Sequence, residues 1–181
     1  MAPPVRTSRE LWIDTGLDLL ATEGPGAVRV EVLAQRLGVT RGGFYRQFGG
    51  RAELVDAMLD TWERRSIDDV RRRVEAEGGG PAGKARKAGM LTFAPDLVPI
   101  DLAVREWARR DTAVAARLRR VDNRRMDYLR ELISAMSDDA GDVEARAMLA
   151  FSLVIGDHLI AADVVGGRAR VLRDATRLIL G

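Results

Sequence analysis

Apolar residues recur at the spacing of an α-helix along almost the whole chain. No stretch alternates polar and apolar residues with the period of two that a half-buried strand shows. The breaks fall mostly at glycines, and the pattern predicts helices over residues 8–23, 30–37, 40–48, 52–77, 98–110, 112–136, 143–164 and 168–180, with one or two shorter helices between 82 and 93. The sequence therefore predicts an all-α fold of about nine helices.

Local signals mark several helix ends. Ser8 is placed to cap the first helix, Gly24 to end it and Gly38 to end the second. Residues 138–142 are predicted to form a turn. The glycine-rich segment 78–83 is predicted to be the most flexible connection of the chain.

Composition narrows the function classes. The chain has 181 residues, 46% of them hydrophobic and 31% charged, which suffices for a packed core. Its apolar runs are shorter than the roughly 18 to 20 residues of a membrane span, and Met1–Arg6 show no secretory signal. There is no Cys and only one His, His158, so we expect a cytoplasmic protein without metal site, cofactor or catalytic residues.

The charge distribution singles out one segment. Lys and Arg number 29 against 27 Asp and Glu, and in most of the chain the two signs interleave, as on solvated helix faces. Between Arg36 and Arg51, however, there are four arginines and no acid. Such a window in a nearly neutral chain is typical of a small surface that faces anions.

The same window lies in a predicted helix-turn-helix. Two short helices are joined by a tight turn at 37–40, in which Gly38 supplies a positive φ and Val39 fills the angle between the helices. In such a unit the second helix enters the DNA major groove, so it needs small residues near its start and outward polar side chains. Phe44 and Phe48 are predicted to face inward, and the candidate DNA contacts are Thr40, Arg41, Gly42, Gly43, Tyr45, Arg46 and Gln47.

Residues 8–62 resemble the DNA-binding domain of the TetR/AcrR transcriptional regulators. The resemblance rests on LLATEG at the end of the first helix, LAQRLGV, FYRQF, and a basic residue, Arg51, before L-x-x-A-M at Leu54 to Met58. It implies a helix-turn-helix DNA-binding domain at 1–52 and a helical ligand-binding and dimerisation domain at 53–181. It also implies phosphate contacts from Tyr45 and Arg51.

Two departures from the family pattern bear on these contacts. Arg46 and Gln47 stand where an aromatic residue and a histidine are common, so the base preferences are left open. Val30 stands where a Ser or Thr usually opens the second helix, and we expect Arg29 to compensate for the lost backbone contact.

Two further sets of residues are predicted in the C-terminal region. The helix over 143–164 is apolar on nearly all sides between Ala147 and Ala162 and must be buried, in part by a partner. The predicted dimerisation residues are Phe151, Val154, Ile155, His158, Leu159, Leu172 and Leu178. An apolar ligand pocket is predicted from Trp62, Met90, Phe93, Trp107, Met126, Tyr128 and Phe151, with an ordinary core as the alternative for each.

The resemblance implies a homodimeric, ligand-responsive regulator, most simply a repressor, that binds double-stranded DNA at a palindromic operator. A small, largely apolar effector of unknown identity would release it. The alternative is a small-molecule binding or partner protein whose helix-turn-helix is vestigial. An enzyme is the weakest option, because nucleophile–base pairs, metal-ligand spacing and phosphate loops are missing from the sequence.

Overall fold

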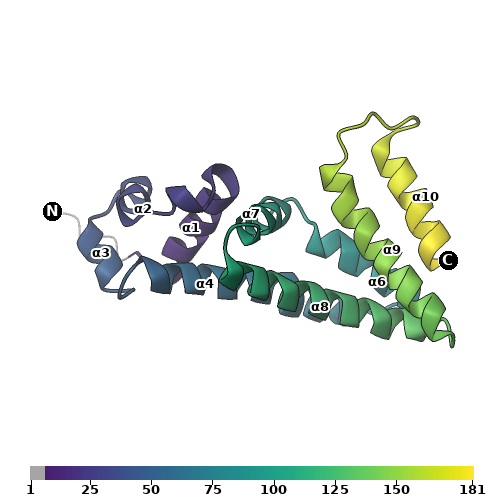
Figure 1. The fold of residues 1–181 in the computed structure, drawn as a ribbon. Helices are drawn as coiled ribbons and strands as arrows, with labels where there is room; N and C mark the ends of the chain where they lie inside the picture. The colour runs from purple at the N-terminus through teal and green to yellow at the C-terminus, as the bar shows by residue number, and fades with distance from the viewer. Residues whose placement is uncertain (1–6) are drawn as a thin grey trace. The chain divides into compact units, whose positions relative to one another are not determined.

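The computed structural model describes residues 7–181 and is α-helical throughout them, which confirms the predicted fold class (Figure 1). Residues 1–6, in which the sequence shows no secretory signal, lie outside the described residues. The elements are α1 Arg9–Glu23, the 3₁₀ turn η1 Pro25–Ala27, α2 Val30–Leu37, α3 Arg41–Tyr45, α4 Arg51–Arg64, the π-helical turn η2 Arg65–Asp69, α5 Val70–Glu77, α6 Pro81–Thr92, α7 Val98–Ala108, α8 Thr112–Ser134, α9 Ala140–Leu159 and α10 Arg168–Leu180.

The long helix predicted over 52–77 forms as one continuous helix from residue 51 to 77. It consists of α4, η2 and α5, and a π turn in its middle widens the helix by one residue without breaking it. Counted in this way, the described residues contain nine α-helices, as predicted.

The signals at the ends of α1 act as expected. The Ser8 hydroxyl accepts a hydrogen bond from the Leu11 N–H at 3.2 Å and so satisfies one of the free donors of the first turn. Gly24, at φ 79°, ends the helix and donates to the Leu20 carbonyl at 3.1 Å.

The chain folds into two compact units. Of the described residues, the first unit contains 7–66 and 95–119, and the second contains 67–94 and 120–181. The core of the first unit is rich in aromatic and long aliphatic side chains, including Trp12, Leu17, Leu20, Leu33, Phe44, Phe48, Leu54, Met58 and Trp62. The functional division at residues 52 and 53 stays a prediction.

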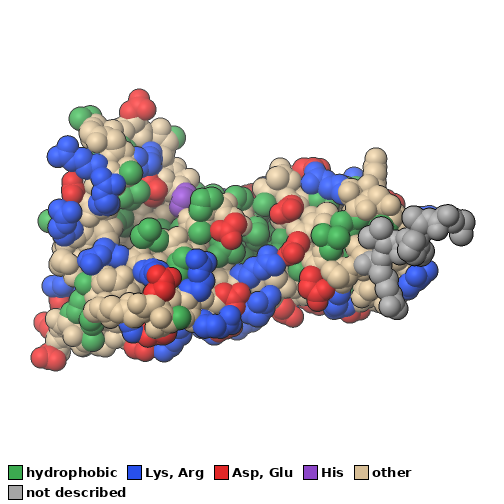
Figure 2. Space-filling model, turned by 180° about the vertical axis from the view of Figure 1, so that it is seen from behind, with side chains coloured by type: hydrophobic (Ala, Val, Ile, Leu, Met, Phe, Trp, Pro, Cys, Tyr) green, Lys and Arg blue, Asp and Glu red, His purple; other side chains and the backbone are tan. Residues whose placement is uncertain are grey.

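The second unit has its own core. Val74, Ile133 and Ala147 are completely buried in it, and they come from α5, α8 and α9. Arg125 is buried in this unit, whereas its other charged side chains are exposed or half-buried. Figure 2 shows both signs interleaved over one face, as the sequence pattern predicts.

Several helix boundaries differ from prediction. The third helix ends at Tyr45 and not at Phe48. Helix α9 begins at Ala140, inside the predicted turn, because the Asp139 carboxylate accepts hydrogen bonds from the Gly141 and Asp142 N–H groups. Segment 78–83 contributes a connection of only three residues, because Pro81 already opens α6.

The largest difference lies at the end of α9, which stops at Leu159 instead of Val164. The reason is Arg168 at the start of α10. Its guanidinium donates to the carbonyls of Asp157 and Ile160, both at 2.8 Å, and to that of Ala162 at 3.1 Å. These bonds satisfy carbonyls that a longer helix would have paired, and they hold segment 160–167 as a loop.

Candidate nucleic-acid interface

The helix-turn-helix is built from α2, a glycine turn and α3. Gly38 has φ 64° and ψ 31°, the left-handed conformation that a residue with a side chain rarely adopts. Its N–H donates to the carbonyl of Gln35, and the Val39 N–H donates to that of Ala34 at 3.0 Å. The turn thereby closes α2 and redirects the chain into α3.

An aromatic cluster fixes α3 on the rest of the first unit. Phe44 and Phe48 are buried, as predicted, and their rings stack with centroids 5.2 Å apart. Trp12 of α1 meets Phe44 edge-on at 5.4 Å. Because aromatic pairs and full burial fix the orientation of a helix this short, the opposite face of α3 is held outward.

The outward face consists of the residues expected to meet DNA. Thr40, Arg41, Gly42, Tyr45 and Arg46 are all exposed, and Tyr45 is 61% accessible although it is aromatic. The fold itself does not require the two glycines. A Cβ atom added at Gly42 would come no closer than 3.7 Å, to the Thr40 hydroxyl, and one at Gly43 no closer than 3.8 Å, to the Trp12 ring.

The arginines of the acid-free window differ in their partners. Arg36 pairs with Glu23 at 2.5 Å, and Arg41 pairs with Glu31 at 3.4 Å. The pair of Arg41 is exposed on both sides, so an approaching phosphate can replace the carboxylate at little cost. Arg46, and Arg29 before α2, form no ion pair with the described residues.

Two candidate contacts also hold the domain together. The Arg51 guanidinium donates to the carbonyls of Val28 at 2.6 Å and Pro25 at 2.9 Å, and so fastens the start of α4 to η1. The half-buried Gln47 donates through its side-chain amide to the Thr7 carbonyl at 3.5 Å. The side chains of Arg41, Tyr45 and Arg46 form no such bonds to backbone carbonyls of the described residues, so they are freer to contact DNA than those of Arg51 and Gln47.

Sequence analysis missed two residues that position α3. Arg9 donates to the backbone carbonyl of Gln47, lies 4.1 Å from the centre of the Phe48 ring and pairs with Glu53 at 3.0 Å. Glu53 also accepts a hydrogen bond from the Gly49 N–H at 2.6 Å, and this bond, followed by the contact with Arg9, lowers the pKa of its carboxyl.

The role of one of these two residues could have been predicted from the sequence, and the role of the other could not. Glu53 lies three residues after the N-cap of α4, the position of a capping-box acid, so its capping role could have been foreseen. No local pattern reveals Arg9, because its partners lie 38 and 44 residues away.

Comparison with known proteins supports the DNA-binding character of this domain. Residues 13–58 match the model of a family described as bacterial regulatory proteins, tetR family. The matched segment contains the helix-turn-helix, which is therefore of the tetR type. The match supports the prediction of a DNA-binding transcriptional regulator, and the family it names consists of regulators and not of enzymes.

Solved structures resemble the regulator over nearly the whole chain. A putative regulator from Saccharomonospora viridis in complex with choline has a TM-score of 0.75 at 16% identity, covering 94% of each chain. AibR in complex with isovaleryl coenzyme A and operator DNA has a TM-score of 0.70 at 15% identity, covering 95% of this chain and 97% of its own. The regulator SCO7518 from Streptomyces coelicolor A3(2) has 0.65 at 21%, covering 98% and 99%. No curated protein matches the sequence.

The residues predicted to form a ligand pocket belong to both units of the regulator. Trp62 is buried in the core of the first unit, where Trp107 is half-buried. The other five belong to the second unit: Met126 and Tyr128 are buried, Phe93 and Phe151 are half-buried, and Met90 is 76% exposed. The exposure of Met90 differs from the burial expected of a pocket-lining side chain.

The predicted dimerisation residues lie on α9 and α10, which are side by side within the second unit (Figure 1). Leu159 and Leu178 are 65% and 88% exposed, and Phe151, Val154, Ile155 and Leu172 are half-buried. The regulator exposes further large apolar side chains nearby that were not predicted: Met148, Leu149, Ile160, Val165 and Val171. Burial of α9 on all sides is thus not achieved within the unit itself.

His158 is exposed, and its ring stacks on Phe93 of the same unit with centroids 5.8 Å apart. Among the described residues, no group of three or more His, Cys, Asp or Glu side chains is placed to hold a metal ion. In the same part of the chain, no helix combines the length and hydropathy that crossing a bilayer requires.

Proposed function

We propose that this TetR-family regulator is a ligand-responsive repressor that binds a palindromic operator as a homodimer. The observation that carries the proposal is the outward face of α3. This face presents Arg41, Tyr45 and Arg46 to solvent, while the opposite face is fixed by buried aromatic rings. A helix held in this way can enter the major groove without reorganising the domain.

The glycines of α3 support this role. Gly42 and Gly43 each cost a helix about 1 kcal/mol relative to alanine. A Cβ atom at either position would meet no close neighbour in the protein. Packing within the protein therefore does not explain why glycine stands at these positions. Close approach of the helix N-terminus to the DNA backbone supplies the missing reason.

The exposed apolar face of α9 and α10 supports dimerisation. Large exposed apolar side chains on two neighbouring helices are typical of interfaces, and a two-fold dimer would bury the same side chains on both chains. In such a dimer the two copies of α3 would lie about one DNA turn apart, roughly 34 to 36 Å, so the operator would be a palindrome. A regulator with this role works in the cytoplasm, on the DNA.

An effector can release the operator only if it binds the DNA-free conformation more tightly than the bound one. The printed descriptions of two related structures name ligands of different chemistry, choline and isovaleryl coenzyme A. Because these two ligands differ in chemistry, they do not indicate one effector class for this chain, and the apolar effector is proposed on the sequence alone.

Alanine variants of α3 test the DNA-binding role against a vestigial helix-turn-helix. Arg41→Ala and Arg46→Ala should each weaken binding to duplex DNA at least tenfold, measured by fluorescence anisotropy, and leave the helical circular dichroism spectrum unchanged. Arg110→Ala, which removes an exposed arginine just after α7, should bind like the wild type. Equal binding by all three variants would favour the alternative of a vestigial domain.

A further inference from the structure

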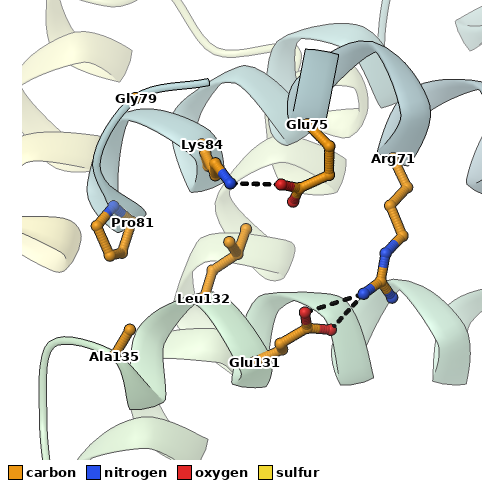
Figure 3. Close-up of a pocket in the computed structure, with 8 residues that line it drawn as sticks. All are labelled: Arg71, Glu75, Gly79, Pro81, Lys84, Glu131, Leu132 and Ala135. Atoms are coloured by element: carbon orange, nitrogen blue, oxygen red, sulfur yellow. Dashed lines mark hydrogen bonds and ion pairs between the residues drawn. The ribbon is translucent and has the colours of Figure 1, made fainter. Parts of the chain in front are cut away.

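The second unit carries a surface hollow of about 490 Å³ between α5, α6 and α8 (Figure 3). This size lies within the range of roughly 300 to 1,000 Å³ that is usual for small-molecule sites. None of the seven residues predicted for an apolar pocket lines it. The lining residues are Arg71, Glu75, Gly79, Pro81, Lys84, Glu131, Leu132 and Ala135.

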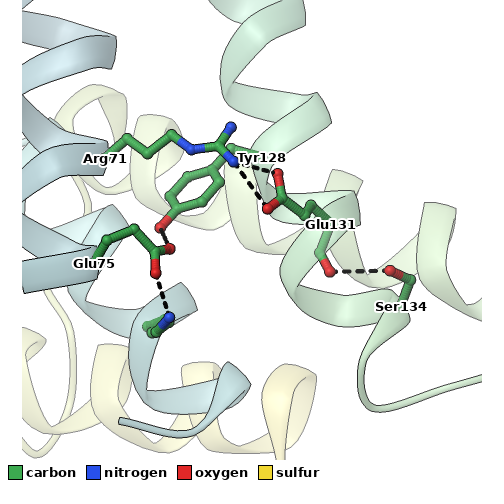
Figure 4. A network of polar contacts seen from close by, with 6 residues as sticks. Arg71, Glu75, Tyr128, Glu131 and Ser134 are labelled. Carbon is green, nitrogen blue, oxygen red and sulfur yellow. Dashed lines mark hydrogen bonds and ion pairs between the residues drawn. The ribbon is translucent and has the colours of Figure 1, made fainter. Parts of the chain in front are cut away.

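Two ion pairs frame one side of the hollow. Arg71 donates to both carboxylate oxygens of Glu131, at 2.9 and 2.8 Å, and Lys84 pairs with Glu75. The hydroxyl of Tyr128 donates to Glu75 at 2.8 Å (Figure 4). The two cations and the two carboxylates cancel, so the hollow favours a ligand that carries both signs over one that carries a single charge.

The ions of the Arg71–Glu131 pair are held in place, yet this pairing is easily exchanged. The Arg71 guanidinium lies 4.8 Å from the centre of the buried Tyr128 ring, which orients it. The side chains of Arg71 and Glu131 are nevertheless 51% and 54% exposed. Pairs this exposed contribute about 0 to 1 kcal/mol, so a ligand's own ammonium and carboxylate can replace the internal partners at little cost.

The Glu75 carboxyl of the second pair is ionised at neutral pH. Lys84 and then Tyr128 lower the pKa of the Glu75 carboxyl. Burial and the adjacent Glu75 raise the pKa of the Tyr128 hydroxyl, so it stays protonated and remains a donor.

The other side of the hollow is apolar. Figure 3 shows Pro81 and Ala135 away from the two ion pairs and Leu132 between the pairs. Gly79 forms part of the rim at φ 106°, and a Cβ atom there would meet nothing within 4 Å. At Gly79 the rim therefore carries no side chain, which leaves room for a short aliphatic chain beside the charged groups.

We propose that this hollow binds a small zwitterion, with its carboxylate at Arg71 and Lys84, its ammonium at Glu75 and Glu131, and an aliphatic tail on Leu132 and Ala135. A ligand bound there contacts α5, α6 and α8 together, so the site is suited to an effector. This last step rests on the proposed regulatory function.

Calorimetric titration of the full chain with three matched probes tests the ligand class. L-Norleucine is the zwitterion with a tail, hexanoate lacks its ammonium and pentylamine lacks its carboxylate. We expect norleucine to bind saturably with a Kd below about 1 mM and the other two to bind at least tenfold more weakly. No saturable norleucine binding, or equal binding of either single-charge probe, would overturn the proposal.

Paired variants test the location. Arg71→Ala and Lys84→Ala should each weaken norleucine binding at least tenfold. Arg72→Ala removes the same charge one residue away, where the side chain is 72% exposed and pairs with Asp69, and should bind normally. Melting temperatures verify that each variant is folded. Equal affinities for all three variants would show that the probe binds elsewhere.

Duplex binding, measured separately, distinguishes the two proposals. Norleucine binding without any duplex binding would contradict the regulatory function and leave the site standing. Duplex binding without norleucine binding would contradict the site alone.

Discussion

Arg9 connects three parts of the first unit through one side chain. It contacts the backbone after α3 at Gln47, the ring of Phe48 and the carboxylate of Glu53 on α4. A single guanidinium thus sets the position of the helix expected to meet DNA, although Arg9 itself lies outside the helix-turn-helix. We regard it as a positioning residue.

We expect Arg9→Ala to lower the free energy of unfolding by about 1 kcal/mol, because one cation–π contact and partly exposed polar contacts are lost. It should also weaken duplex binding, since α3 loses a tether. Urea titration and anisotropy measure the two effects. Arg110→Ala removes an exposed pair elsewhere in the same unit and should change neither. Unaltered duplex binding by Arg9→Ala would contradict the positioning role.

Gly42 offers a test in which stability and function move in opposite directions. Gly42→Ala should raise the free energy of unfolding, by up to about 1 kcal/mol, because alanine favours the helix and meets no close neighbour. The same methyl group should weaken duplex binding at least tenfold by holding the helix away from the DNA backbone. Thermal unfolding and anisotropy report the two quantities.

Gly83→Ala is the matched control, because Gly83 lies within α6 and also has open space around its Cβ position. It should give a similar gain in stability without any loss of duplex binding. Undiminished duplex binding by Gly42→Ala would show that the glycine does not serve close approach.

The residue pattern predicted which side chains of α3 face outward, but it did not predict the hydrogen bonds that hold α3 and its neighbours in place. The exposure of Arg41, Tyr45 and Arg46 follows from helical spacing opposite Phe44 and Phe48. The structural bonds of Arg51 and Gln47 did not follow, because their partners are backbone carbonyls 23 or more residues away. Local sequence carries no record of such contacts.

At the scale of the element, α3 is too short to be stable alone and depends on its aromatic anchor. Phe44 is completely buried between Trp12 and Phe48. We expect Phe44→Ala to cost about 3 to 5 kcal/mol, the usual result of removing a buried ring. Chemical denaturation measures the loss, and a cost below about 1 kcal/mol would contradict the anchoring role.

Helix ends were predictable wherever a short-range signal sets them. The bounds of α2 agree with prediction because Gly38 is a local stop, and α1 because Ser8 and Gly24 cap it. The predicted end of α9 is wrong because the observed end depends on Arg168, which contacts Asp157 eleven residues before it. The predicted start of α9 is wrong because Asp139 favours a turn in the sequence pattern, and the same side chain can also cap a helix, as it does here.

At the scale of the whole molecule, the proposed homodimer would cover the exposed apolar side chains of α9 and α10. Leu159→Glu combined with Leu178→Glu should convert the dimer to a monomer, because each charge would be buried twice in a two-fold interface. Sedimentation velocity gives the oligomeric state. Leu11→Glu, at a 46% exposed leucine of α1, should remain dimeric. A double variant that stays dimeric would place the interface elsewhere.

The central claim is that two copies of α3 meet DNA one turn apart, and selection of bound sequences from a random duplex pool tests it most directly. The purified protein should recover a palindrome whose half-site centres lie about 10 base pairs apart. Its affinity for that duplex should fall steeply between two salt concentrations, with a logarithmic slope of about −0.9 per phosphate neutralised. Recovery of no sequence above background, from protein shown to be folded and dimeric, would contradict the account.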